Sequence, residues 1–212
     1  MQRVGSWFLP EREKHLVKYI ERDDAYQQAE RDHALAFVQC HSEAIDIGAH
    51  VGLWARDLGN HFDMVHCFEP IPHHFMCLLA NLPNTTDKYR FYRQALGERE
   101  GTLQIDVDDS CTGAAHVAET GQVVPCAKLD DFRFGQIGFI KIDCEGYEGP
   151  VLRGSKLTLL RHKPIINIEQ KQKKKGSLYQ GAGRKAFEGC EVLESYGAKL
   201  LSQFKSEYVF GW

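Results

Sequence analysis

Four acidic residues, each at or near the end of an apolar run, are the residues of this 212-residue chain best placed to do chemistry. They are Asp46, Glu69, Asp143 and Glu169. Short apolar runs bounded by turn signals predict buried strands of a parallel sheet, so the four carboxylates should lie along one of its edges. Ligands of open α/β sheets bind at that edge. Such clustering is costly without a cation or a hydroxyl-rich ligand between the acids, so the pattern predicts a binding site.

A glycine-containing turn follows the first acid, in the segment 44–52 with the sequence AIDIGAHVG. The apolar start predicts a strand, and the pattern over 53–58 predicts a helix. Gly48 and Gly52 would let the backbone approach a ligand closely. The spacing differs from the dinucleotide fingerprint G-x-G-x-x-G, and Asp46 would repel a pyrophosphate. An ammonium or sulfonium group, in contrast, would be attracted to this carboxylate.

Glu69 follows Asp46 by 23 positions and ends the next predicted strand. An acid at this distance and place can accept hydrogen bonds from both hydroxyls of a ribose. On its own, Glu69 could equally be a solvated carboxylate at a strand end. Together with the glycine turn, it favours a ligand that carries a ribose.

The segment FIKID, at 139–143, places charged residues in what should be a central strand. The two-residue period of a strand puts Lys141 and Asp143 on one face, and a lysine there needs a partner. Asp143 lies at the carboxyl end of this strand, where ligands bind, and Glu145 follows two residues later, so a role in binding or catalysis is favoured for both. Glu148 is better explained as a residue of the first turn of a helix, where the helix dipole favours an acid.

The rest of the chain alternates strands and helices, which predicts a largely parallel sheet with helices on both faces. Strands are expected at 44–48, 64–69, 89–95, 136–143 and 164–169. Helices are expected to begin at 53 and at 72, and two further helices to cover 147–160 and 184–196. Irregular strands are expected within 101–126, and a hairpin over 199–212. Residues 1–40 contain an apolar segment, WFLP, and two expected helices over 11–22 and 26–38. These helices would either pack against the sheet or cover the ligand site.

Length and composition suit a single globular domain with a full core. The formal net charge of −3 argues against a general nucleic-acid coat protein. The seven cysteines are scattered without a C-x-x-C pair, which fits reduced thiols in the cytoplasm better than disulfides or a zinc site. No membrane-spanning run and no signal peptide is recognisable, and no feature indicates an oligomeric state.

Five segments together resemble the FkbM family of S-adenosylmethionine-dependent methyltransferases. They are DIGAHVG from Asp46, FEP from Phe68, QALG from Gln94, KLDD from Lys128 and KIDCEGYE from Lys141, and the match runs over about 43–170. The resemblance implies a Rossmann-like class I methyltransferase fold: a mostly parallel seven-stranded sheet, helices on both faces and an antiparallel C-terminal strand. This domain would span 41–212, behind an N-terminal helical extension over 1–40 that is a candidate active-site cover.

The resemblance also assigns roles to individual residues. Glu69 would hold the ribose diol, and Asp143 would face the methionine amino group or the transferred methyl. Pro70, Gln94 and Ala95 would border the adenine. The full set of implied cofactor-binding residues is Asp46, Gly48, Ala49, Gly52, Glu69, Pro70, Gln94, Ala95 and Asp143.

The implied reaction is O-methylation of a hydroxyl on a sugar, a glycan or a similar small molecule. If the lysines within 171–175 contact this methyl acceptor, the acceptor should be acidic. An alcohol needs a base, and Glu145 and Glu169 are the best candidates, followed by Asp143. Lys141 belongs to the same catalytic set. A bound Mg²⁺ would be another way to lower the pKa of the alcohol, although no metal-ligand set is predicted.

Two other functions stay open at the level of sequence. A nucleic-acid methyltransferase would use the lysine-rich segment 171–175 to contact phosphate, and its binding would be salt-sensitive. The same lysines would suit an acidic small acceptor or form a solvated loop. A non-catalytic partner subunit with the same fold would bind S-adenosylmethionine weakly or without turnover.

Overall fold

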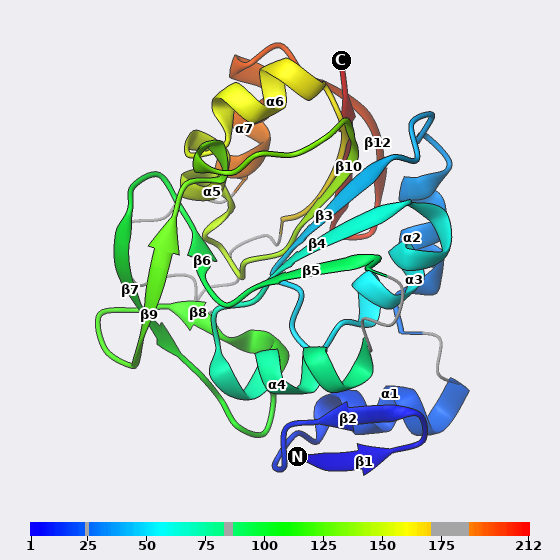
Figure 1. Ribbon diagram of the computed structural model, residues 1–212, viewed down its shortest axis with the longest axis vertical. Coiled ribbons are helices and arrows are strands. Elements are labelled where there is room, and N and C mark those ends of the chain that lie inside the picture. The colour runs from blue at the N-terminus through cyan, green and yellow to red at the C-terminus, as the bar shows by residue number, and fades with distance from the viewer. Residues whose placement is uncertain (24–25, 83–86, 171–186) are drawn as a thin grey trace.

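A seven-stranded sheet forms the centre of the protein, in the strand order β12-β13-β11-β10-β3-β4-β5 (Figure 1). The computed structural model describes residues 1–23, 26–82, 87–170 and 187–212. The strands β3, β4, β5, β10 and β11 run parallel, whereas β13 is antiparallel to both of its neighbours. This is the sheet that the resemblance to the FkbM family implied, including the antiparallel C-terminal strand. Its strands are β3 (Glu43–Ile47), β4 (Met64–Phe68), β5 (Tyr89–Tyr92), β10 (Ile137–Ile142), β11 (Ile165–Glu169), β12 (Lys199–Phe204) and β13 (Glu207–Gly211).

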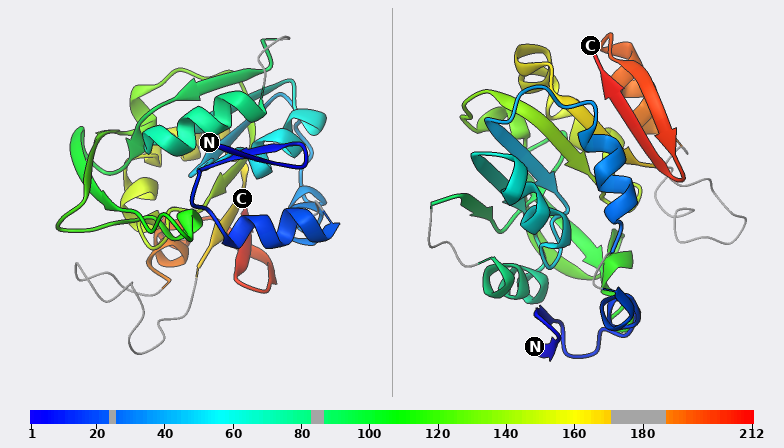
Figure 2. Two further views of the ribbon diagram at one scale, coloured as in Figure 1. Left: turned by 90° about the horizontal axis from the view of Figure 1, so that it is seen from below. Right: turned by 90° about the vertical axis from the view of Figure 1, so that its right-hand side faces the viewer.

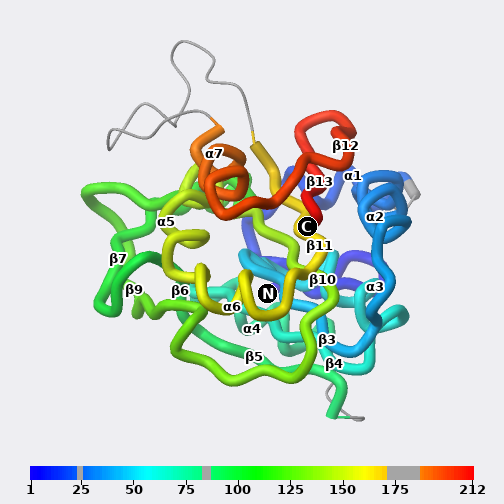
Figure 3. The backbone as a smooth tube through the Cα atoms, turned by 90° about the horizontal axis from the view of Figure 1, so that it is seen from above, coloured from blue at the N-terminus to red at the C-terminus, as the bar shows by residue number. Residues whose placement is uncertain are grey.

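Helices cover both faces of the sheet because its central strands are apolar on both sides (Figure 3). Ile45 and Ile140 belong to a core with α5, α6 and α7, whereas Ala44 and Phe139 belong to a second core with α2, α3 and α4. The helices are α2 (Gln28–Leu35), α3 (Leu53–His61), α4 (Pro72–Asn81), α5 (Glu148–Arg153), α6 (Lys156–His162) and α7 (Glu188–Ser195).

The helix expected over 147–160 is divided into α5 and α6. Asp130, which lies in the 3₁₀ turn η2 (Leu129–Asp131), accepts hydrogen bonds from the backbone N–H groups of Leu157 and Thr158. These contacts satisfy free donors at the start of α6 and so permit a new helix there. The expectation of one helix was therefore wrong, because the cap comes from a distant segment.

The strand expected over 89–95 is also divided. Its first part is β5, and the chain then leaves the main sheet to form β6, which pairs with β9. Ala95 packs there with Ile71, Ile105 and Val124 in a separate apolar cluster. This second sheet has the order β6-β9-β7-β8, and its elements are β6 (Ala95–Leu96), β7 (Gly101–Asp106), η1 (Thr112–Ala114), β8 (His116–Val117) and β9 (Gln122–Ala127).

The N-terminal residues form a β-hairpin and a helix, where the sequence indicated only an apolar segment and a helix. The hairpin of β1 (Gln2–Val4) and β2 (Trp7–Leu9) packs with α1 (His15–Asp23) beside α4, away from the sheet faces (Figure 2). Asn81 of α4 fixes it by bonding both the N–H and the C=O of Phe8. In contrast, α2 packs on the sheet, where its Ala34 is fully buried.

The seven cysteines all lie in the described residues and are free thiols, as expected. Among the described helices, none is both long and apolar enough to cross a bilayer.

Candidate functional site

A cavity of about 360 Å³ lies at the carboxyl ends of β3, β4 and β10. Its volume is in the range of small-molecule sites. Residues of the α1 region and of the segment 111–117 form walls of the same cavity. The sequence-predicted residues that line it are Gly48, Ala49, Glu69, Pro70, Gln94, Ala95, Lys141, Asp143, Glu145 and Glu169. Asp46 and Gly52 are not among the lining residues.

Gly48 and Gly52 have different structural roles. Gly48 has a φ of 81°, and a Cβ there would lie 2.0 Å from the carbonyl oxygen of Asp143. The turn after β3 therefore packs directly on the end of β10, which only glycine permits. Gly52 has a φ of 93° and lies against the side chains of Leu78 and Leu82 in the α4 region. Its role in this structure is helix packing.

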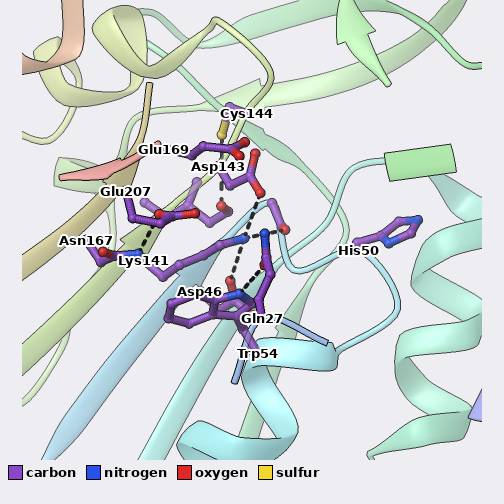
Figure 4. A network of polar contacts seen from close by, with 12 residues as sticks. Gln27, Asp46, His50, Trp54, Lys141, Asp143, Cys144, Asn167, Glu169 and Glu207 are labelled. Carbon is purple, nitrogen blue, oxygen red and sulfur yellow. Dashed lines mark hydrogen bonds and ion pairs between the residues drawn. The ribbon is translucent and has the colours of Figure 1, made fainter. Parts of the chain in front are cut away.

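Lys141 connects the acids at the floor of the site (Figure 4). Its Nζ lies 3.7 Å from Asp46 Oδ1 and 3.4 Å from Asp143 Oδ2, and it donates a hydrogen bond to the carbonyl of Gly48. The parallel register explains the first contact, because Lys141 is paired with Asp46 across β10 and β3. The nearby carboxylates of Asp143 and Asp46 raise the pKa of Lys141 although burial opposes them. Lys141 is therefore a charged lysine that holds Asp143 in place.

Asp46 is fully buried, and neither of its carboxylate oxygens accepts a hydrogen bond from the described residues. Burial raises its pKa to about 6, and Lys141 opposes this shift. A buried carboxylate with so few hydrogen bonds to replace those of water is stabilised by a cation nearby. Lys141, at 3.7 Å, is the cation that compensates this buried carboxylate.

Glu69 lies at the end of β4, and its carboxylate is fixed from two sides. Its Oε2 accepts the backbone N–H of His50 at 2.9 Å, and its Oε1 accepts that of Ile71 at 2.9 Å. His74 Nδ1 lies 3.5 Å from Oε1. Each carboxylate oxygen can accept more than one hydrogen bond, so Glu69 can still bind a pair of hydroxyl groups.

Asp143, Glu145 and Glu169 form a group of acids at the same end of the sheet, and an oxygen of each lies within 4.8 Å of the other two. Glu145 has a φ of 47°, in a turn that is braced by Glu148. The Oε1 of Glu148 accepts the N–H groups of Cys144 and Gly146, both at 3.0 Å. Glu148 lies in the first turn of α5, which is the structural role that the sequence predicted.

Several residues of the site could not be identified from the sequence pattern. Gln27 accepts a hydrogen bond from Trp54 Nε1 at 2.7 Å, and both residues line the cavity. Glu207 of β13 lies beside Asn167, whose Nδ2 donates to it at 2.8 Å (Figure 4). An unexpected acid in the last strand was the only signal for Glu207. The lysine-rich segment 171–175 lies outside the described residues.

Replacing Glu207 with Gln should stabilise the protein at alkaline pH. Burial, followed by repulsion from Asp143, raises the pKa of Glu207 to about 7 from 4.5. The folded state thus holds this proton more tightly than the unfolded state, so stability is lost as the pH rises from about 4.5 through 7. Glu207→Gln should raise the free energy of unfolding by about 1–3 kcal/mol at pH 8 and give little or no gain at pH 4.5. Urea denaturation at both pH values measures this, with the exposed Glu191→Gln as the control. Equal gains at both pH values would contradict it.

Comparison with known proteins agrees with this geometry. The family model described as Methyltransferase FkbM domain matches residues 46–199. A search of curated proteins finds no significant match. Among solved structures, the FkbM methyltransferase of Methylobacillus flagellatus KT shares 16% sequence identity at a TM-score of 0.55, over 84% of this chain and 45% of the other. The present chain thus spans less than half the length of that protein.

Two other solved methyltransferase structures are also similar to this chain. A SAM-dependent methyltransferase of Leishmania major shares 11% identity at a TM-score of 0.53, over 93% of this chain and 77% of the other. The N-methyltransferase NodS of Bradyrhizobium japonicum WM9 shares 8% identity at a TM-score of 0.55, over 89% and 97%. These similarities show a common Rossmann-like methyltransferase fold. Because the family model covers most of the chain and its match includes the glycine turn and the three grouped acids, the protein belongs to the FkbM methyltransferase family.

Proposed function

We propose that the protein transfers a methyl group from S-adenosylmethionine to a hydroxyl of a sugar, a glycan or a similar small molecule. The observation that carries this proposal is the shared cavity that collects Glu69, the turn at Gly48 and the three grouped acids. The proposed ribose-binding acid and the candidate bases thereby line one cavity, as methyl transfer to an alcohol requires.

The residues of the cavity fit the proposed cofactor. Glu69 offers acceptors for the ribose hydroxyls, and Pro70, Gln94 and Ala95 would border the adenine. Asp143 would bind the amino group of the methionine part. Asp46 lies below and adds negative charge without touching the ligand. Among the described residues that line the cavity, four acids face a single lysine, Lys141, and this excess of negative charge supports a cationic ligand group.

The cofactor supplies an electrophilic methyl group bound to a positively charged sulfur. The residues of this chain would bring an alcohol to that methyl and accept the proton from its oxygen. Glu145 and Glu169 are the proposed bases, and Asp143 lies within the same group. Lys141 is proposed to position Asp143 through their 3.4 Å contact. Enclosure between the strand ends and the segment 111–117 would exclude water during the transfer.

Glu69→Gln should weaken the binding of S-adenosylhomocysteine, the demethylated cofactor. The amide can accept from only one of the two backbone N–H groups that Glu69 now binds, and its own NH₂ would meet the other. Loss of this ordered acceptor should cost about 1–3 kcal/mol of binding free energy. Isothermal titration calorimetry measures the difference, with Glu119→Gln on the surface as the matched control. Unchanged affinity in Glu69→Gln would remove the ribose assignment.

The acceptor class is tested with a methyl-release assay on neutral glycans, acidic glycans and RNA. The proposal expects turnover with a glycan or another small hydroxyl compound. If a carboxylate acts as the base, turnover should be the same in the presence of EDTA and in the presence of Mg²⁺. Methyl transfer to RNA alone, sensitive to salt concentration, would instead support the nucleic-acid alternative. Transfer to an amine would reject O-methylation.

A further inference from the structure

A buried carboxylate from the N-terminal segment reaches the wall of the cavity. Glu13 is 1% exposed and lies just before α1. Its Oε1 accepts the backbone N–H of Leu16 at 2.8 Å, which caps the helix. Its Oε2 accepts both the backbone N–H and the hydroxyl of Thr112, a residue 99 positions away. Two segments distant in sequence are thus joined at one buried acid.

Thr112 continues the contact into the cavity. Its hydroxyl oxygen lies 2.8 Å from Nε2 of His50. Because the hydroxyl proton is donated to Glu13, the oxygen must accept, so Nε2 of His50 carries the proton. Burial, and then the neighbouring His74 and Lys141, lower the pKa of His50, which is therefore neutral with Nδ1 unprotonated. The hydrogen bond thus selects one tautomer of His50.

His50 in turn holds Glu69. Its backbone N–H donates to Oε2 of Glu69 at 2.9 Å, and its backbone has a φ of 51°, in the left-handed region. The ring of His50 also meets the ring of His74 edge-on at 4.5 Å, and His74 contacts the other oxygen of Glu69. A non-glycine residue with this φ is strained unless its surroundings hold it. Anchoring the His50 ring therefore anchors the N–H that orients Glu69.

We propose that Glu13 and Thr112 are positioning residues for the cofactor ribose, acting through His50 on Glu69. This inference rests on the proposed function, because it assigns the ribose to Glu69. It gives the N-terminal segment a specific role, because the carboxylate of Glu13 sets the geometry of a binding residue at the end of β4. Loss of the Thr112 hydroxyl should leave the His50 ring free to turn and Oε2 of Glu69 without a fixed donor, although Ile71 still binds Oε1.

The test compares Thr112→Val, which removes the hydroxyl at similar size, with Thr112→Ser, which keeps it. Thr112→Val should weaken S-adenosylhomocysteine binding roughly tenfold, as expected for a buried group left unpaired, and Thr112→Ser should retain most of the affinity. Glu13→Gln should behave like Thr112→Val. Arg12→Gln is the matched control, because it breaks an exposed contact between the same two segments, Arg12 to Asp109.

A second ligand separates positioning from general damage. For the 2′-deoxy analogue of S-adenosylhomocysteine, Thr112→Val should cost less than about threefold, because one of the two hydroxyls that Glu69 would bind is missing. Equal losses for both ligands, or no loss for either, would overturn the inference while leaving the proposed function intact. Failure of the unmodified protein to bind S-adenosylhomocysteine would instead refute the proposed function and the inference together.

A further measurement needs no variant. The ¹⁵N chemical shifts of the His50 ring in the unmodified protein at pH 7.5 should show a neutral ring protonated at Nε2. A ring protonated at Nδ1, or a charged ring, would contradict the chain of hydrogen bonds on which the inference depends.

Discussion

Gly48→Ala should destabilise the protein by about 3–5 kcal/mol and abolish cofactor binding at ordinary ligand concentrations. The new Cβ would lie 2.0 Å from the carbonyl oxygen of Asp143 and 3.1 Å from its carbon. Backbone atoms cannot rotate away as a side chain can, so the turn after β3 and the end of β10 must separate. The positive φ of 81° adds conformational strain. Both effects act at the point where the cofactor is proposed to bind.

Gly197→Ala is the matched control for this experiment. Gly197 has a similar φ, 92°, but a Cβ there would meet nothing within 4 Å. It should therefore show only the conformational cost, about 1–2 kcal/mol, with unchanged binding of S-adenosylhomocysteine. Denaturant unfolding and calorimetry measure both variants. If the two alanines cost the same, the close approach of the turn to Asp143 has no energetic consequence and the explanation for Gly48 fails.

Lys141→Met should have an effect of similar size, for an electrostatic reason. The substitution keeps an unbranched side chain but leaves the fully buried Asp46 without the cation at 3.7 Å. Removing one partner of a buried ion pair costs about 3–5 kcal/mol, because an uncompensated charge remains. Urea denaturation at pH 8 should show this loss. At pH 5 the loss should be smaller, since the pKa of Asp46 is already raised to about 6 and its protonation removes the charge.

The double variant Lys141→Met with Asp46→Asn separates charge from packing. It should recover at least half of the stability lost in Lys141→Met at pH 8, because the buried group is then neutral. Asp46→Asn alone is the reference for the cycle. A double variant as unstable as Lys141→Met would mean that lost packing of the lysine chain, and not the carboxylate, causes the damage.

The sequence by itself determined the strands of the main sheet and the edge of that sheet at which the acidic residues gather. Strand periodicity placed Lys141 and Asp143 on one face, and the parallel sheet then brought the strand-end acids together. Gly48 was also recognisable, since a glycine directly after a strand and before a helix indicates a turn with unusual φ. These features follow from local rules, in which each residue's neighbours in the chain decide its conformation and its exposed side.

Other parts were decided only by tertiary structure. The separation of β5 from β6 depends on an apolar cluster with the second sheet, and the separation of α5 from α6 depends on Asp130. Glu13 gains its partner from a residue 99 positions away. Local sequence patterns record which face of an element is apolar, but they do not record which distant segment will supply a cap, a buried partner or a wall of the cavity. Packing of whole elements makes that choice, so these contacts could not be predicted from the order of the residues alone.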